Sequence, residues 1–293
     1  MKVLFTWNYN GNAIKIAGDF TRWELINIPN KYIEFDIDIG IYEYKFNIDG
    51  KWCCDNNKPT IINTYGTKNN LISVNNGIVH MVHISDTHSK FPKNLRPAEI
   101  LIHTGDFSID GHPGEYEQFN EWIGRQKYLY KIVILGNHDL DYTIREQKKD
   151  PIKLAKERLS NCIVLNYESI NLYGYDIYGM PWYDYHNWNY SYKYENNLEN
   201  EFNIIPNNTS ILLTHGPAYN FLDSNYGSKK LLDIITKIKP KYHLFGHIHQ
   251  QYGILINHWF DNNETVFINS SLVDESSNFI INEPHYIKLK IIA

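Results

Sequence analysis

Seven side chains able to bind a divalent metal stand at five separate places in the chain, each just after a short apolar segment. They are Asp86, His88, Asp106, Asn137, His215, His247 and His249. Imidazoles, carboxylates and one amide oxygen without a thiolate suit Mn²⁺, Fe²⁺ or Zn²⁺ better than a structural zinc knot or a calcium loop. Seven ligands are too many for one tetrahedral ion. The set therefore predicts two ions with one bridging carboxylate.

A pair of such ions predicts phosphoester hydrolysis. Two ions roughly 3.5–4 Å apart lower the pKa of a shared water and stabilise both oxygens of an in-line phosphoryl displacement. Two divalent ions bring four positive charges, while Asp86, Asp106 and a hydroxide return three. The site would stay attractive to phosphate.

His138 is flanked by Asn137 and Asp139 but is not among the expected ligands. A free imidazole beside a metal cluster is suited to protonate a departing alkoxide. We expect His138 to be the general acid and Asp139 to orient it.

The apolar segments before these residues have strand character and must position them. They run over residues 81–84, 100–102, 132–135, 211–213 and 243–245. In an open α/β sheet, ligands collect outside the carboxyl ends of the strands, so five such ends can meet at one pocket. Taken singly, each motif is more often a strand cap or a packing histidine, as we expect for His80, His83 and His103. Their convergence is what predicts a site.

Strands and helices alternate beyond residue 77, which predicts an α/β domain of two sheets flanked by helices. Helices are expected over 113–126, 152–159 and 228–238, and a hairpin over 169–180. Strands over 252–256, 266–269 and 286–292 predict a second, more antiparallel sheet. The aromatic segment 182–194 has no period and is expected to be either a lid or a covered loop.

Residues 1–75 read as an all-β sandwich, because apolar residues alternate along several short segments between glycine turns. Trp23 and Trp52 each follow a turn. Tryptophans on the solvent side suit the apolar face of a pyranose. The same pattern also fits tryptophans in the core. We expect the boundary at residues 75–77 and two domains, 1–75 and 79–293.

Composition limits the partners and the location. The chain has 293 residues, 43% of them hydrophobic, a formal net charge of −5 and no lysine or arginine cluster. This argues against binding a nucleic-acid polymer. No run of eighteen apolar residues predicts a membrane span, and the amino terminus turns polar too early for a signal peptide. The three cysteines, Cys53, Cys54 and Cys162, form no disulfide framework, so a cytoplasmic protein is expected.

Five motifs match, in order, those of the calcineurin-like metallophosphoesterase superfamily. They are Asp86-Thr87-His88, Gly105-Asp106, Gly136-Asn137-His138-Asp139, His215-Gly216 and Gly246-His247-Ile248-His249. This resemblance implies that one ion is held by Asp86, His88, Asp106 and His249. It implies that the other is held by Asp106, Asn137, His215 and His247.

Further segments, among them Thr104-Gly105-Asp106-Phe107 and Gly179-Met180-Pro181-Trp182, are similar to the animal metallophosphoesterase-domain-containing branch. That branch is associated with hydrolysis of cyclic-nucleotide phosphodiesters. The resemblance implies a phosphodiesterase for small nucleotides, with Mn²⁺ as the expected ion and Fe or Zn as alternatives.

The amino-terminal segments 18–23, 44–52 and 65–70 resemble the glycogen-binding module of the AMP-activated protein kinase β subunit. This resemblance implies that Trp23 and Trp52 stack on glucose rings and that Lys45 and Asn69 bond hydroxyl groups. Tyr65 stands where that family often has leucine, and an aromatic ring there can pack inside a curved glucan.

The sequence thus predicts a phosphoesterase for a small phosphoester or nucleotide, targeted to a glycogen-like glucan. One alternative is a glucan phosphatase, to whose metals the module would present phosphorylated polymer. The other is a non-catalytic glycan-binding or regulatory protein.

Overall fold

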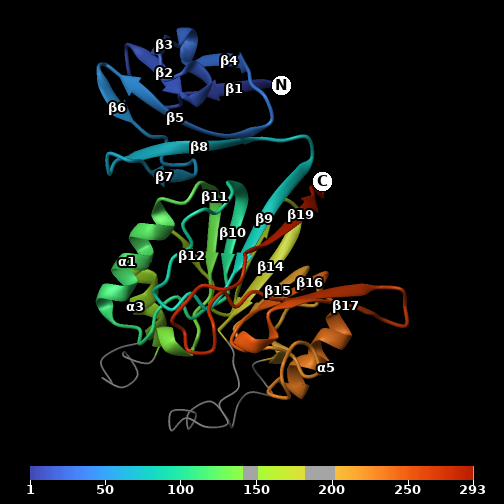
Figure 1. Cartoon of the computed structure of the whole chain (residues 1–293). Coiled ribbons are helices and arrows are strands. Elements are labelled where there is room, and N and C mark those ends of the chain that lie inside the picture. Colours follow the sequence, from blue (N-terminus) through green and yellow to red (C-terminus); the bar gives the residue numbers. More distant parts are fainter. Residues whose placement is uncertain (141–150, 182–201, 293) are drawn as a thin grey trace.

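The computed structural model describes residues 1–140, 151–181 and 202–292. The aromatic segment 182–194, expected to be a lid or a covered loop, lies outside these residues. Figure 1 shows a smaller all-β unit packed on a larger α/β unit. No helix among the described residues is long and apolar enough to cross a membrane.

The amino-terminal unit is a sandwich of two sheets. The smaller sheet pairs β1 (Lys2–Thr6) with β4 (Tyr32–Asp36), antiparallel. The larger has the order β3-β2-β5-β8-β7, with β6 also paired to β5. Its strands are β2 (Ile14–Gly18), β3 (Ile26–Asn27), β5 (Gly40–Ile48), β6 (Lys51–Cys53), β7 (Thr60–Ile62) and β8 (Lys68–Val74). Short 3-10 helices lie at Asp19–Thr21 (η1) and Pro29–Lys31 (η2).

Alternation along β5 divides this larger sheet into two faces. Tyr44 and Phe46 are buried and pack with Phe5 and Trp7 between the sheets. Successive side chains of a strand point to opposite faces, so Glu43 and Lys45 lie on the other face. The predicted β-sandwich is confirmed.

The first sheet of the α/β unit has the order β12-β11-β10-β9-β19. Strands β9 (Ile78–Ile84), β10 (Ala98–His103), β11 (Tyr128–Val133) and β12 (Ile163–Val164) are parallel. β19 (His285–Lys290) is antiparallel to β9 and pairs Ile287 with Met81. The prediction that placed this last strand in the second sheet was wrong. Ile287 and Leu289 are buried with the β9 side chains, and β19 pairs the free edge of β9.

The second sheet has the order β13-β14-β15-β16-β18-β17. Its strands are β13 (Glu168–Leu172), β14 (Tyr175–Met180), β15 (Ile211–Thr214), β16 (Tyr242–Phe245), β17 (Gly253–His258) and β18 (Glu264–Asn269). Only the two edge strands are antiparallel to their neighbours, as the predicted 169–180 hairpin requires for β13. The second sheet is thus more antiparallel than the first, as expected, although its inner strands are parallel. Parallel strands are joined by crossovers that cover both faces of a sheet, and all four residues of β15 are buried.

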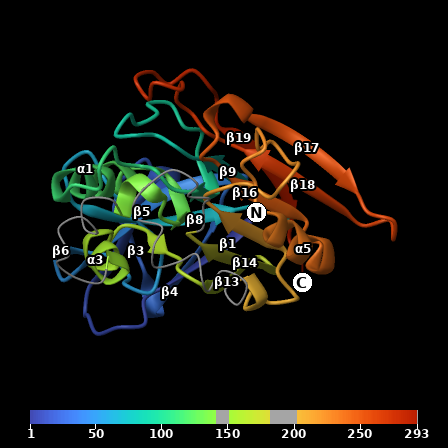
Figure 2. The same ribbon diagram turned by 90° about the horizontal axis from the view of Figure 1, so that it is seen from below.

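The two sheets pack face to face and helices cover the outer faces, which confirms the α/β class. α1 (Pro113–Gly124) and α3 (Pro151–Arg158) lie on the first sheet, and α5 (Lys229–Ile238) lies on the second. Figure 2 shows α1 and α3 on one side of the molecule and α5 on the other. The hydroxyl of Ser228 caps α5 by accepting a hydrogen bond from the Leu231 N–H at 3.1 Å.

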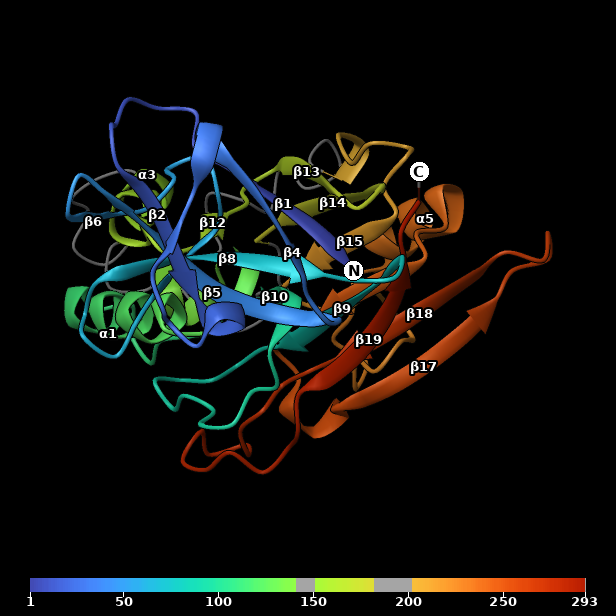
Figure 3. The same cartoon turned by 90° about the horizontal axis from the view of Figure 1, so that it is seen from above.

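The amino-terminal unit rests on the edge of the first sheet where β10 and β11 begin. β8 runs across this edge in Figures 1 and 3. Ser73 of β8 donates a hydrogen bond to Glu99 of β10 at 2.6 Å, and Ile62 packs against Gly124. The carboxyl ends of the same strands lie at the opposite edge, about 20 Å away for a strand of six residues.

Candidate metal centre

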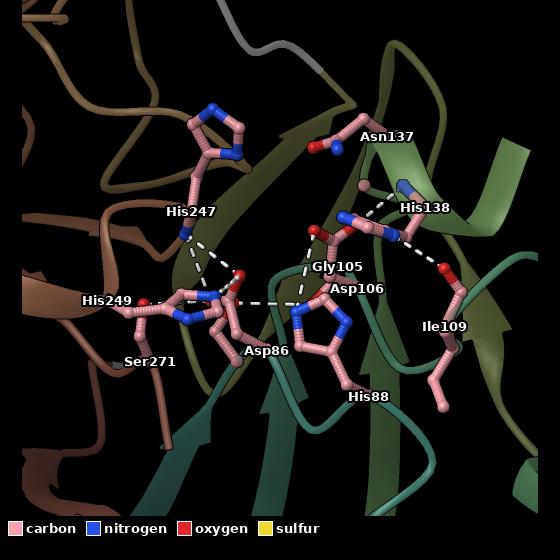
Figure 4. Close-up of polar contacts among 12 residues, drawn as sticks. Asp86, His88, Gly105, Asp106, Ile109, Asn137, His138, His247, His249 and Ser271 are labelled. Carbon is pink, nitrogen blue, oxygen red and sulfur yellow. Dashed lines mark hydrogen bonds and ion pairs between the residues drawn. The ribbon is translucent and has the colours of Figure 1, made fainter. Parts of the chain in front are cut away.

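Five loops from both sheets bring the predicted ligands together. Asp86 and His88 follow β9, Asp106 follows β10 and Asn137 follows β11. His215 follows β15, and His247 and His249 follow β16. Figure 4 shows side chains from four of these loops around one space. The strand ends expected to share one edge therefore come from two sheets that meet.

The backbone of these loops is bent so that the carboxylates face inward. Asp86, His88 and Asp106 have φ values of 50°, 40° and 56°, in the left-handed region that non-glycine residues rarely adopt. A Cβ on Gly246 would overlap Oδ2 of Asp86, and a Cβ on Gly136 would overlap Oδ1 of Asp106. Glycine is therefore required at these two places of close approach.

One group of ligand atoms belongs to Asp86, His88 and His249, and these atoms lie within 4.8 Å of one another. Nε2 of His249 is 3.4 Å from Oδ1 of Asp86. Nδ1 of His249 donates to the carbonyl of Asp274 at 2.9 Å, which leaves Nε2 directed at the carboxylate. Burial lowers the pKa of His249, but Asp86 outweighs it and raises this pKa to about 9.

A second group belongs to Asp106, His215 and His247, again with ligand atoms within 4.8 Å of one another. Nε2 of His215 is 3.1 Å from Oδ2 of Asp106 and 3.1 Å from Oδ1 of Asn137. Its Nδ1 donates to the Thr104 carbonyl at 2.7 Å. Burial opposes protonation of His215, yet Asp106 raises its pKa to about 9. In return, His215 holds the pKa of the buried Asp106 below its usual value.

The residues present fit divalent ions. Nε2 of His88 is buried and has no hydrogen-bond partner among the described residues, although it faces Oδ2 of Asp106 at 4.0 Å. Burial lowers the pKa of His88 and lowers that of His247 to about 4, which favours the neutral imidazole that binds a metal. Asp106 lies between the two groups, where a bridging carboxylate is expected.

His138 lies beside the first group. Its ring is perpendicular to that of His88, with 4.7 Å between the centroids. Burial lowers the pKa of His138, but the Asp106 carboxylate and the Ile109 carbonyl together raise it above its usual value. The net effect favours the protonated form of the ring.

The expectation that Asp139 orients the His138 ring is corrected by the geometry. Nδ1 of His138 donates to the carbonyl of Ile109 at 2.5 Å. The buried Asp139 carboxylate instead accepts hydrogen bonds from the N–H groups of Asp106 (2.8 Å), Ser108 (3.0 Å) and Gly136 (2.9 Å). Burial and the nearby Asp106 raise the pKa of Asp139 to about 7. Asp139 therefore fixes the loops that carry the site through these hydrogen bonds and makes none to the ring.

Sequence reasoning missed the residues that support the ligands. The hydroxyl of Ser271 donates to Oδ2 of Asp86 at 2.9 Å, and the backbone N–H of Ser271 donates to Oδ1 of Asn269 at 3.0 Å. A signal existed, because Asn269 to Ser271 is a polar segment at the end of the predicted strand 266–269. The carbonyls of Ile109 and Asp274 had no such signal, since every residue carries one.

The predicted carbohydrate contacts lie on and around the outer face of β5 and its neighbours. Trp23, Trp52 and Tyr65 are exposed by 41%, 49% and 90%. Lys45 donates to the Thr67 hydroxyl at 3.3 Å. Asn69 is buried, and its amide is bonded within the protein: Nδ2 donates to Glu43 at 2.9 Å, and Oδ1 accepts from Asn63 at 3.0 Å.

The fold has two packed sheets covered by helices, and histidines and carboxylates gather where the ends of the two sheets meet. This is the framework of a metal-dependent phosphoesterase. Residues 79–251 match the family model described as calcineurin-like phosphoesterase. Residues 1–80 match the glycogen recognition site of AMP-activated protein kinase. The chain belongs to the calcineurin-like phosphoesterase family and carries a glycogen-binding module before its enzyme domain.

Similar proteins agree with both parts. Metallophosphoesterase domain-containing protein 1 of Homo sapiens is 33% identical over 222 residues, 67% of this chain and 67% of that protein. A UPF0046 protein of Caenorhabditis elegans is 36% identical over 218 residues, 67% of this chain and 76% of that protein. The 5'-AMP-activated protein kinase subunit beta-1 of Sus scrofa is 31% identical over 75 residues, 24% of this chain and 62% of that protein. Both predicted resemblances are confirmed.

Proposed function

We propose that the protein hydrolyses the phosphodiester bond of a small nucleotide, of the cyclic-nucleotide class, while its amino-terminal module docks on a glucan. The observation that carries the hydrolytic part is the position of Asp106, 3.1 Å from His215 on one side and 4.0 Å from His88 on the other. One carboxylate thereby joins two complete ligand groups. The choice of a nucleotide as substrate rests on the similarity to the animal metallophosphoesterase branch.

The proposed ligand sets are Asp86, His88, Asp106 and His249 for one ion, and Asp106, Asn137, His215 and His247 for the other. Bound divalent ions, with Mn²⁺ as our choice, supply an activated water and neutralise charge on the phosphoryl group. The chain holds these ligands ready, because Ser271 fixes Asp86 and the Thr104 carbonyl fixes His215.

His138 is our candidate for the general acid. Its Nδ1–H donates a hydrogen bond to the Ile109 carbonyl, so the second N–H of the imidazolium is on Nε2. The raised pKa favours retention of this proton. Nε2 can then protonate the departing alkoxide, and the hydrogen bond to Ile109 keeps the ring from turning.

For the module, we propose that Trp23, Trp52 and Tyr65 stack on glucose rings, as their exposure allows. Lys45 and Asn69 would form hydrogen bonds with hydroxyl groups of the glucan. To do so, Asn69 would give up its hydrogen bond to Glu43 or the one from Asn63. We place the domain boundary between residues 75 and 79, where β8 gives way to β9. A cytoplasmic location is our inference from the three free cysteines.

The arrangement of the two sites favours a small substrate over the polymer itself. The module covers the edge where β10 and β11 begin, and the ligands lie beyond the other ends of these strands. A glucan segment held on the module is thus about 20 Å or more from the metals. The glucan phosphatase remains the second candidate because a long polymer could still reach around the domain. The complete ligand set argues against a non-catalytic role.

The test is a substrate panel with added Mn²⁺. It compares a 2′,3′- and a 3′,5′-cyclic nucleotide, bis-p-nitrophenyl phosphate and phosphorylated glycogen, each with and without soluble unphosphorylated glucan. We expect the highest kcat/KM on a nucleotide diester. Faster phosphate release from phosphoglucan would instead establish the phosphatase.

A further inference from the structure

Two carboxylates lie beside each other on the outer face of the module, each bonded to a proposed glucan contact. Oδ1 of Asp19 accepts a hydrogen bond from the indole N–H of Trp23 at 3.1 Å. Oε2 of Glu43 accepts one from the amide of Asn69 at 2.9 Å. The carboxylates are adjacent, since Oδ2 of Asp19 also accepts the backbone N–H of Glu43 at 2.9 Å. Together they set the positions of Trp23 and Asn69.

The charge that balances this pair comes from the enzyme domain. Lys127 lies between α1 and β11, and its Nζ donates to Oδ2 of Asp19 at 3.0 Å. The same nitrogen is 3.6 Å from Oε1 of Glu43. The three side chains are only 28%, 34% and 21% exposed, in the order Lys127, Asp19, Glu43. Partly buried pairs are screened less by salt than fully exposed ones.

Without Lys127 the two carboxylates would repel each other. Asp19 lies in the turn that carries Trp23, whereas Glu43 lies in the strand β5. Repulsion between them would move the turn away from the strand, and the indole of Trp23 would move with it. The module alone therefore lacks a group that its own binding face needs.

We propose that Lys127 is a positioning residue of the glucan-binding site, so that the site for a neutral α-glucan is completed by the enzyme domain. This inference rests on the proposed glucan binding by the module. Lys127 acts through Asp19 and Glu43. It thereby keeps Trp23 and Asn69 at the distance from each other that glucan binding requires. Because coupling is reciprocal, a bound glucan in turn stabilises the ion pairs that join the two domains.

The experiment measures binding of maltoheptaose to the full chain by calorimetry, at 50 mM and 500 mM NaCl. The variants are Lys127→Met, Lys127→Gln and Lys127→Arg. The matched control is Arg125→Met, which removes a cation two residues away that pairs with Glu121 inside the enzyme domain. Thermal unfolding reports whether each variant folds, and either neutral variant suffices if the other does not.

We expect the neutral variants to bind maltoheptaose about threefold to tenfold more weakly, as two partly exposed ion pairs allow. Lys127→Arg should restore most of the affinity, and Arg125→Met should match the wild type. A neutral sugar has no charge for salt to screen. Wild-type protein should therefore bind maltoheptaose more weakly at 500 mM NaCl than at 50 mM. If Lys127→Met does not show this dependence on salt, the ion pairs are its cause.

The outcomes separate this inference from the proposal beneath it. Wild-type binding with equal affinity in both neutral variants would overturn the role of Lys127 and leave glucan binding intact. Equal losses in Lys127→Met and Lys127→Arg would also overturn it, since the charge would not matter. A wild type that fails to bind maltoheptaose would overturn the glucan proposal and this inference together.

Discussion

The backbone N–H of His138 donates a hydrogen bond to Oδ1 of Asp106 at 2.9 Å. The residue proposed as general acid is thereby fixed to the carboxylate that joins the two ligand groups. Asp139 fixes the same junction from behind, through the Asp106 N–H. The proposed proton donor and the proposed bridging ligand are thus joined by hydrogen bonds.

Replacing His138 should slow the reaction in a way that depends on the leaving group. We expect His138→Ala to reduce kcat by roughly 100-fold or more on a nucleotide diester, in line with the usual contribution of general acid catalysis. The loss should be small on bis-p-nitrophenyl phosphate, whose leaving group needs no proton. His258→Ala on the exposed part of β17 is the control. Equal losses on both substrates would rule out the acid role.

Replacing a proposed metal ligand should reduce metal binding more than replacing a residue that forms a hydrogen bond with a ligand. Ser271→Ala removes the hydrogen bond to Asp86 and should weaken metal binding by roughly 10–100-fold, the usual effect of an outer partner. Asp106→Asn should reduce the metal content below one ion per chain, because both groups lose their shared carboxylate. Elemental analysis and Mn²⁺ titration of chelator-treated protein measure this. Two ions retained in Asp106→Asn would refute the shared ligand.

The exposed tryptophans should account for glucan binding. We expect wild-type protein to co-sediment with glycogen and the Trp23→Ala, Trp52→Ala double variant to remain in the supernatant. The matched control is Trp7→Phe, a conservative change of a tryptophan buried between the sheets of the module. If the double variant still co-sediments with glycogen as the wild type does, the face that carries Trp23 and Trp52 is not the glucan-binding face.

A buried lysine should make stability depend on pH. Lys131 in β11 is 5% exposed, and its Nζ bonds only weakly to the Gly124 carbonyl at 3.3 Å. Burial lowers its pKa from 10.5 to about 8. Between these values the unfolded chain holds a proton that the folded chain has released, so the free energy of unfolding rises with pH in this window. Below pH 8 the folded state bears the full penalty of the buried charge.

Lys131→Met should therefore stabilise the protein at pH 7, by about 3 kcal/mol at most. Urea unfolding at pH 7 and pH 10 measures the difference between variant and wild type, and this difference should shrink at the higher pH. Lys288→Met, at an exposed position of β19, should behave like the wild type. A difference that does not change with pH would mean that Lys131 is not charged when folded at pH 7.

The candidate site could be predicted from the sequence because each proposed ligand follows a strongly apolar segment, and these segments are strands in the structure. Asp86 and His215 were placed at strand ends on this basis alone. The pairing of β19 with β9 was missed because period-two alternation shows which residues are buried but not which sheet takes the strand. The contact between Asp19 and Lys127 joins residues 108 positions apart. Surface charges at that separation leave no mark in the sequence.

The module covers the edge of the sheet opposite the ligand loops. The proposed glucan contacts and the proposed metal ligands therefore lie at different places on the molecule, so that a bound particle would leave the ligand loops open to a small phosphoester. Enzyme molecules crowded on one granule would not block one another's openings. Under the proposed function, such a coated granule would be a stationary catalyst for a phosphoester that diffuses past it.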